Sequence, residues 1–369
     1  MFTYGRLFRA AAAAVAVGTA AGTAGAQQRL STTAGPDCLT APAYQFTPPC
    51  PIPGTLSPGT VGTESAPLAD ASPSFATRTA GAGVGESTSV SLGGYIDNAA
   101  PTTMFRLRYD NGYGMNRPDR AEFFYAKCGC FRGANPPQLD AHGPPLPETN
   151  IDYQEILPYF EYAFSPRFSL FGTIPVRLIN PAANRNASGL GDIDFGFKYA
   201  FVQGPTRTLS LQVRAIAPSG NEGAGLGTGN WWLEPGLLYL EQFNTRWQGF
   251  GELRYQIPLS KQSDFTGSVL RYGVGTAYQV VQQDWGYAAP VGELVGWTAL
   301  SGRELADSGA VDATGATIVN AKVGVRVGFG KKDCNSSQTP NDIYVGYGRA
   351  LTGEFWYKDM LRIEYRRFF

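Results

Sequence analysis

Apolar and polar residues alternate through most of the chain from about residue 88 onward. Between residues 192 and 201, odd positions hold Ile or aromatic residues and even positions hold Asp, Gly, Lys or Ala. Successive side chains of a β-strand point to opposite faces, so such a segment has one apolar face and one polar face. The same pattern recurs in residues 167–179, 208–217, 247–258 and 317–329. The chain is therefore predicted to be all-β.

The lengths of these segments favour strands that cross a membrane. Strands are predicted near residues 103–110, 120–127, 152–164, 167–179, 190–201, 208–217, 231–241, 247–258, 269–282, 288–300, 317–329, 342–350 and 359–368. Several exceed the usual five or six residues of strands in soluble sheets and suffice to cross a bilayer at a tilt. Short turns such as Ser165-Pro166 and long Gly- or Pro-rich connections such as 301–316 are typical of an outer-membrane barrel.

Ionisable residues on the predicted polar faces distinguish a barrel in lipid from a soluble sandwich. Around a polar lumen they can pair with one another while the apolar face meets lipid. Asp192 and Asp194 could bind a cation or steer a solute, but pairing with neighbouring lumen Arg or Lys is the favoured interpretation. We expect these residues to face the lumen and the path of a solute: Arg106, Arg108, Asp192, Asp194, Lys198, Arg214, Glu252, Arg254, Lys322 and Arg326.

Aromatic residues near the predicted strand ends and at the C-terminus support the same fold. Tyr and Trp collect at membrane–water interfaces, where amphipathic rings are favoured. The predicted aromatic belt comprises Tyr199, Trp231, Tyr239, Trp247, Tyr287, Trp297, Trp356 and Tyr357. The amphipathic last segment ends on Phe369, which resembles the sorting signal by which the barrel assembly machinery recognises outer-membrane barrels.

The N-terminal part differs from the rest in composition. Arg6 and Arg9, the apolar run 10–17 and the small residues up to Ala26 predict a signal peptide spanning residues 1–26 and cleaved near Ala26. Residues 27–87 are rich in Pro, Gly and Ser, with too few apolar residues to offset the entropy of ordering, and are predicted to be a disordered leader. Residues 88–369 are predicted to form the barrel, so the mature protein is expected in the outer membrane.

Charge and composition argue against several other functions. Thirty basic residues balance 30 acidic ones, so nucleic acid is not an expected partner. The single histidine, His142, excludes multi-histidine zinc sites, and no catalytic residue, metal or cofactor is predicted. The pairing of Cys38, Cys50, Cys128, Cys130 and Cys334 stays open. A bond within Cys128-Gly129-Cys130 is disfavoured at that spacing, and pairing with other loop cysteines is preferred.

Two stretches resemble a known family. The sequence Gly189-Leu190-Gly191-Asp192-Ile193-Asp194-Phe195-Gly196-Phe197-Lys198-Tyr199 is similar to a conserved strand of the outer-membrane family named for the meta-pathway of phenol degradation. Ala217-Pro218-Ser219-Gly220 and the segment 232–240 lie where that family has a loop and its next strand. The resemblance covers roughly residues 150–369 and implies a barrel of about 12 strands (about 10 to 14) that transports hydrophobic or aromatic compounds.

Two functions follow as hypotheses. In the first, the barrel lets a small hydrophobic or aromatic solute cross passively, with the lipid bilayer as its surroundings and no covalent chemistry. In the second, the lumen is filled by side chains and the barrel is a structural or envelope-anchoring protein without transport. What occupies the lumen distinguishes them.

Overall fold

The computed structural model describes residues 90–133, 137, 141–259, 265–283, 285–306, 309–330 and 339–369. The chain divides into two units, residues 1–72 and 73–369, and every described residue belongs to the second. The predicted signal peptide, the predicted leader, Cys38, Cys50 and Cys334 lie outside the described residues.

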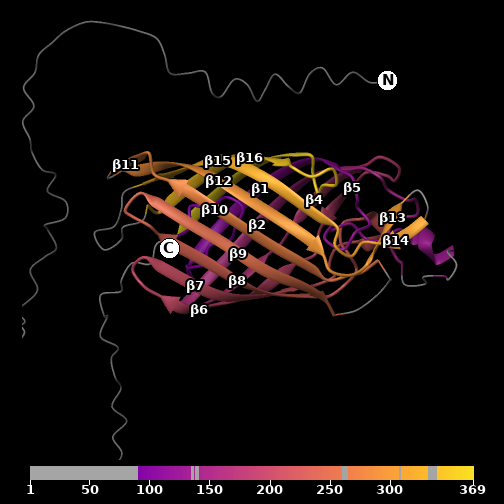
Figure 1. Ribbon diagram of the computed structural model, residues 1–369, viewed down its shortest axis with the longest axis horizontal. Helices are drawn as coiled ribbons and strands as arrows, with labels where there is room; N and C mark the ends of the chain where they lie inside the picture. Colours follow the sequence, from indigo (N-terminus) through magenta and orange to yellow (C-terminus); the bar gives the residue numbers. More distant parts are fainter. Residues whose placement is uncertain are drawn as a thin grey trace, which may run out of the picture. The chain divides into compact units, whose positions relative to one another are not determined.

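The described residues form a closed antiparallel barrel of twelve strands (Figure 1). In chain order the barrel strands are β1 (Met104–Met115), β2 (Ile151–Ser165), β3 (Phe168–Thr173) with β4 (Val176–Pro181), β5 (Ala187–Leu190) with β6 (Asp194–Gln203), β7 (Arg207–Ile216), β8 (Trp232–Gln242), β9 (Trp247–Pro258), β10 (Val269–Tyr278), β12 (Gly286–Ala299), β15 (Thr317–Phe329), β16 (Asn341–Ala350) and β17 (Asp359–Phe368). Breaks near Pro175 and Gly191 divide two of these strands into paired segments.

Among the described residues, five smaller elements accompany the barrel. Strand β11 (Val281–Gln283) pairs with β12, whereas β13 (Arg303–Ala306) and β14 (Gly309–Asp312) form a separate hairpin. Two 3₁₀ helices, η1 (Gly129–Gly133) and η2 (Glu222–Ala224), lie in the connections. No described helix has the length and apolarity needed to cross a membrane.

Strand β1 closes the sheet because it pairs with both its neighbours in the ring. Met104 lies opposite Phe368 of β17 and also opposite Glu161 of β2. A closed sheet leaves no unpaired strand edge, which is the condition for β-structure in lipid. The predicted fold class is confirmed.

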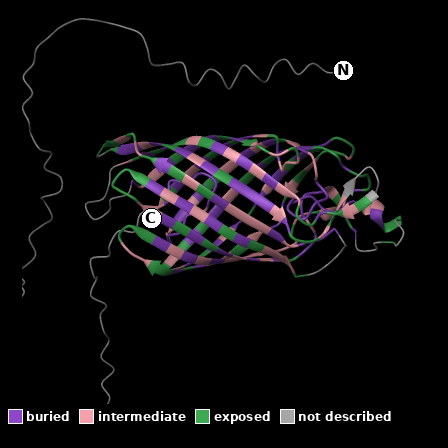
Figure 2. Cartoon of the chain, in the orientation of Figure 1, coloured by how far each residue is buried: buried purple, intermediate pink, exposed green. Residues whose placement is uncertain are grey.

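The predicted two-faced strands are also confirmed, as the alternating burial along each strand in Figure 2 shows. Along β15, Val323, Val325 and Val327 are exposed, whereas Lys322 and Arg326 are buried. The outer surface is thus apolar and the inner surface carries the charges. Burial of this outer face in acyl chains is favourable because apolar surface is removed from water.

Half of the predicted aromatic belt is wrong. Tyr199, Trp231, Tyr239 and Trp247 are exposed on the outside, but Tyr287, Trp297, Trp356 and Tyr357 pack inside the barrel. For Tyr287 and Trp297 the alternation along β12 decides the direction of the ring, whereas Trp356 and Tyr357 lie in the β16–β17 connection.

The two rims of the barrel differ in the length of their connections. β2 and β3, β6 and β7, and β8 and β9 are joined by short turns at the rim where β1 begins and β17 ends. Several connections at the other rim are much longer, namely residues 116–150, 217–231 and 300–316. In Figure 1 the C-terminus and the β13–β14 hairpin accordingly lie at opposite ends of the barrel. Short periplasmic turns and longer external loops are the usual arrangement.

The strand predicted for residues 120–127 is wrong. This segment makes turns and bends, and all of its side chains are buried. Its sequence Arg-Ala-Glu-Phe-Phe-Tyr-Ala-Lys does not alternate, so it has no face suited to lipid. Its charged residues instead find partners within the long-loop end of the barrel.

Candidate functional site

Residues 90–103, here called the plug, precede the first strand and lie inside the barrel, where Figure 1 shows this part of the chain in dark purple near β10. The plug has no helix or strand of its own. Its backbone groups therefore need partners from the wall, because buried N–H and C=O groups are costly when unpaired.

Charged side chains of the wall supply these partners. The Glu293 carboxylate on β12 accepts the backbone N–H groups of Gly94, Tyr95 and Ile96 at 2.9 to 3.3 Å. Arg326 on β15 donates to the carbonyl oxygens of Leu92 and Gly93 at 2.9 and 2.6 Å. In the same way Arg362 donates to the Gly94 carbonyl and Arg366 to the Ser91 carbonyl.

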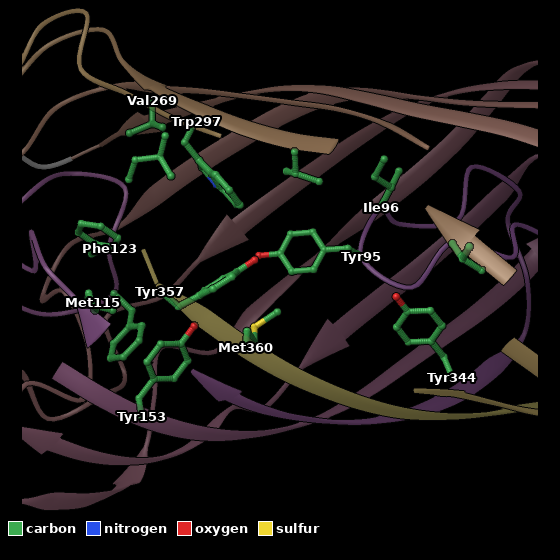
Figure 3. Close-up of a cluster of buried hydrophobic side chains, with 14 of the residues drawn as sticks. Tyr95, Ile96, Met115, Phe123, Tyr153, Val269, Trp297, Tyr344, Tyr357 and Met360 are labelled. Atoms are coloured by element: carbon green, nitrogen blue, oxygen red, sulfur yellow. The ribbon is translucent and has the colours of Figure 1, made fainter. Parts of the chain in front are cut away.

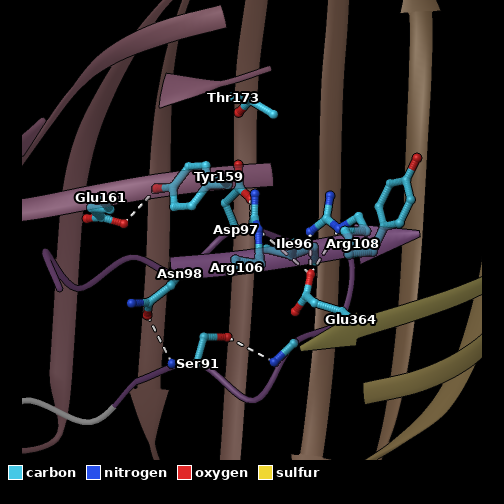
Figure 4. Close-up of polar contacts among 12 residues, drawn as sticks. Ser91, Ile96, Asp97, Asn98, Arg106, Arg108, Tyr159, Glu161, Thr173 and Glu364 are labelled. Carbon is cyan, nitrogen blue, oxygen red and sulfur yellow. Dashed lines mark hydrogen bonds and ion pairs between the residues drawn. The ribbon is translucent and has the colours of Figure 1, made fainter. Parts of the chain in front are cut away.

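Asp97 is the ionic centre of the plug. Its carboxylate lies 3.1 Å from Arg106 Nη1, 2.8 Å from Arg214 Nη2 and 2.7 Å from Arg254 Nη2. Figure 4 shows Asp97 and Arg106 side by side, with Glu364 below Arg108. Three cations from β1, β7 and β9 thus converge on one carboxylate of the plug, which ties it to widely spaced parts of the wall.

Close packing adds to these bonds. A Cβ atom at Gly94 would run into the Tyr344 ring, which also covers Gly324 and Gly346 on the adjacent wall. Ile96 lies against Gly273, where an added Cβ would meet Ile96 Cδ1 at 3.1 Å. Glycines on both the plug and the wall permit this approach, so the plug packs closely against the wall at this level.

A second closure, here called the cap, consists of residues 117–127 at the long-loop end. Buried Arg120 pairs with Glu122, with Glu304 of β13 at 3.3 Å and with Glu354 of the β16–β17 connection. Lys127 Nζ donates to the Arg120 carbonyl oxygen at 2.5 Å. These contacts connect three loops across the opening.

The bond within Cys128-Gly129-Cys130 is present, directly after the cap. The expectation that these cysteines pair with other loop cysteines is therefore wrong. The neighbouring backbone explains how the loop accommodates the bond: Gly129 N–H donates to the Pro144 carbonyl, and Gly143 N–H donates to the Lys127 carbonyl. Phe131 and Phe265 stack beside the two cysteines.

A cavity of about 200 Å³ lies between the plug and the cap. Its lining includes Tyr95 from the plug and Phe123 from the cap, together with Trp297 and Trp356. Ring centroids are 6.1 Å apart for Tyr95 and Trp297, 5.3 Å for Trp297 and Trp356, and 5.6 Å for Trp356 and Phe123. Figure 3 shows Tyr95 and Trp297 in this cluster with Met360. An aromatic arc thus runs from the plug to the cap.

Ion pairs surround the aromatic arc. Arg362 binds Asp110, Arg177 binds Glu155 at 2.6 Å, and Arg271 binds Glu252 at 2.7 Å. The guanidinium carbon of Arg362 lies 4.1 Å from the centre of the Tyr95 ring, and that of Arg177 lies 4.2 Å from the Phe124 ring. The cavity therefore offers ring faces and paired charges together.

All ten residues predicted to face the lumen are buried or half-buried. The structure brings Arg106, Arg214 and Arg254 together on Asp97, and Glu252 onto Arg254 at 2.8 Å. Lys198 pairs with Glu161 at 3.0 Å, while Arg108 and Arg326 meet at Glu364.

Asp192 and Asp194 have separate partners. Asp194 lies 3.5 Å from Arg214 Nε. Asp192 instead accepts the backbone N–H groups of Gly220 and Thr228 and so fixes the 217–231 connection. Asp194 thus pairs with a lumen arginine, as favoured from the sequence, whereas Asp192 does not. Within the described residues, no group of three or more His, Cys, Asp or Glu is arranged to hold a metal ion.

Sequence reasoning did not find the plug residues Tyr95 and Asp97. Residues 90–103 carry one charge and no periodic pattern, so they resemble the preceding leader. The one available signal of the plug in the sequence is the excess of arginine on the polar faces. This excess predicts that a carboxylate from outside the strands enters the lumen.

Comparison with known proteins identifies the family. The family model described as the MetA-pathway of phenol degradation matches residues 141–332, more than half of the chain. The chain belongs to this family. The resemblance seen in residues 189–199 and 217–220 lies within the matched range and is confirmed. As a closed barrel of this family with an apolar exterior, the protein is located in the outer membrane.

Solved structures of outer-membrane barrels are similar to this member of the phenol-degradation family. An outer-membrane channel from Pseudomonas putida F1 is 16% identical, with a TM-score of 0.48 and coverage of 76% of this chain and 100% of that one. The β domain of the Bordetella autotransporter BrkA is 11% identical, with a TM-score of 0.42 and coverage of 73% and 100%. The NanC porin is 11% identical, with a TM-score of 0.41 and coverage of 71% and 99%. No curated protein matches the chain.

Proposed function

We propose that the protein lets a small hydrophobic or aromatic solute cross the outer membrane passively, through the lumen and without covalent chemistry. The observation that carries this proposal is the cavity of about 200 Å³ between plug and cap. A cavity of about 150 Å³ suffices for one benzene ring, and the arc of Tyr95, Trp297, Trp356 and Phe123 offers ring faces for stacking.

The charge distribution supports a solute of low charge. The guanidinium groups that line the cavity are already paired with carboxylates, so a solute gains little from them without breaking a pair. The family's description, which refers to phenol degradation, agrees with an aromatic solute. Passage requires the plug and the cap to shift, because each fills one end of the lumen.

The plug also favours a second candidate function. The plug is bonded to Glu293 and Arg326, and its Asp97 contacts three arginines, as expected of a segment that stays in the lumen permanently. A barrel closed in this way would be a structural or envelope-anchoring protein that conducts nothing. The two functions make opposite predictions for flux.

Liposome swelling distinguishes the two candidate functions. The assay uses phenylalanine and arabinose, two osmolytes of similar size that differ in the aromatic ring. We expect faster swelling with phenylalanine, and slower swelling after Trp297→Ala, which interrupts the aromatic arc. The Asp97→Asn variant, in which the attachment of the plug to the wall is weakened, is assayed beside the wild type. Folded wild-type and Asp97→Asn barrels that give neither swelling nor planar-bilayer conductance would overturn transport and support the closed barrel.

A further inference from the structure

Lys322 has no counter-ion among the described residues, although it lies in the middle of β15 and is 4% exposed. Its cross-strand partner on β12 is Glu293, but that carboxylate is occupied by the backbone N–H groups of the plug. Lys322 Nζ also has no hydrogen-bond acceptor. A buried ammonium without a partner is costly, so the group calls for an explanation.

Other donors without acceptors lie beside this ammonium. Asn320, two positions before Lys322 on the same face of β15, is fully buried and makes no side-chain hydrogen bond. The Tyr357 hydroxyl is likewise fully buried and unpartnered. Lys322 Cγ and the Tyr357 hydroxyl both lie 3.3 to 3.4 Å from the position of a Cβ on Gly348, so both side chains lie beside this glycine. Asn320 Oδ1 is an unpartnered acceptor, but the ammonium, the Asn320 amide N–H groups and the Tyr357 hydroxyl together supply more donors than this one oxygen can take, which indicates a missing acceptor.

Aromatic rings enclose the ammonium. It contacts the Tyr95 ring and lies 5.1 Å from the Tyr357 ring centre and 5.9 Å from that of Trp297. Tyr95 and Trp297 also line the cavity between plug and cap, together with Trp356, whose indole N–H is unpartnered. Lys322 itself does not line the cavity, so the ring of Tyr95, a plug residue, separates the cation from it.

We propose that Lys322, Asn320 and Tyr357 form a site for a monovalent anion, and that its ligand is the carboxylate of a small aromatic acid whose ring occupies the cavity beside Trp297. The site lies outside the ion-pair network, so a carboxylate binds without displacing a protein carboxylate. Tyr95 covers the ammonium in the empty site and moves aside for the ligand. This inference rests on the proposed function in one respect, namely that the bound acid is also the transported solute. Binding of the acid does not itself require transport.

Isothermal titration of the folded, detergent-solubilised full-length protein with sodium benzoate tests this site without requiring flux. Benzyl alcohol is the neutral probe of the same ring size, and sodium chloride is the free-anion probe. We expect saturable benzoate binding that Lys322→Met weakens about tenfold or more, as for loss of a hydrogen bond to a charged group. Lys322→Arg is expected to retain part of the affinity.

A matched control keeps the comparison specific. The double variant Lys198→Met with Glu161→Gln removes another buried lysine together with its partner and is expected to bind benzoate as the wild type does. If Lys322→Met does not fold, Asn320→Ala takes its place, with the same expected direction of change.

The probes assign the source of the anion. Chloride that competes with benzoate at similar concentration supports an anion site filled by free halide, whereas benzoate binding that chloride does not affect supports the aromatic acid. Absence of benzoate and chloride binding, or benzoate binding that is equal in Lys322→Met, overturns the site. Because swelling measures flux and titration measures binding, a barrel that binds benzoate but conducts nothing would contradict only the proposed transport.

Discussion

Arg254 on β9 and Asp97 on the plug face each other inside the barrel, with Nη2 2.7 Å from Oδ2. Arg254 also binds Glu252 and Glu234, so the plug carboxylate is one member of a continuous ionic network. Removing one member of a buried ion pair leaves the other charge uncompensated, which is strongly destabilising. The plug is therefore held by the same network that organises the wall.

Asp97→Asn is expected to increase ion conductance. The substitution leaves three guanidinium groups facing a neutral amide and weakens the attachment of the plug. Single-channel recording in planar bilayers checks this, and we expect larger or more frequent openings than in the wild type. Glu155→Gln, which weakens an ion pair between two wall residues, Glu155 and Arg177, is the control. Equal conductance in Asp97→Asn and the control would show that Asp97 does not hold the plug.

Glu364→Ala is expected to destabilise the barrel by about 3–5 kcal/mol, the usual cost of removing one partner from a buried ion pair. Arg108 and Arg326 both lie within 2.8 Å of this carboxylate. Urea unfolding in lipid vesicles measures the free energy. Glu241→Ala breaks a pair with exposed Arg207 and should have little effect. Similar losses in the two variants would contradict the role given to the lumen network.

Val323→Arg tests the outer face. Val323 lies at the centre of β15 and Leu351 beyond the end of β16, and each is 61% exposed. A charge at the bilayer midplane costs about 2–4 kcal/mol, and near the interface about 0–1 kcal/mol. We expect Val323→Arg to lower the free energy of unfolding in vesicles far more than Leu351→Arg. Equal effects would mean that the two positions lie at the same depth.

Glu148, in the connection before β2, gives a prediction about pH. Burial acts to raise the pKa of this carboxyl, but hydrogen bonds from the backbone N–H groups of Asn184, Ala183, Asn150 and Thr149 outweigh it and lower the pKa below the ordinary value of 4.5. The stabilisation is present above pH 4.5 and is lost as the pH falls through the lowered pKa. The amide proton shift of Ala183 in NMR spectra should titrate with a midpoint below 4.5. A midpoint at or above 4.5, or the same titration in Glu148→Gln, would contradict this.

Alternation located twelve of the thirteen predicted strands, since each has one lipid-facing and one lumen-facing side. Nearness to a strand end is the wrong criterion for Trp297, because the alternation along β12 sets its direction, and Tyr357 lies in a connection where no alternation applies. Alternation also missed the plug and the cap. These segments are enclosed on all sides, so no two-faced pattern marks them, and their partners come from distant strands.

Hydrogen exchange of the plug tests the central claim most directly. The amides of Gly94, Tyr95 and Ile96 are bound by Glu293 inside the lumen, so they should exchange as slowly as amides of strand β12 in the folded protein in nanodiscs. Glu293→Ala should speed their exchange while leaving the amides of β2 protected. Exchange of residues 90–103 at the rate of an unstructured peptide in the wild-type barrel would contradict a plugged lumen.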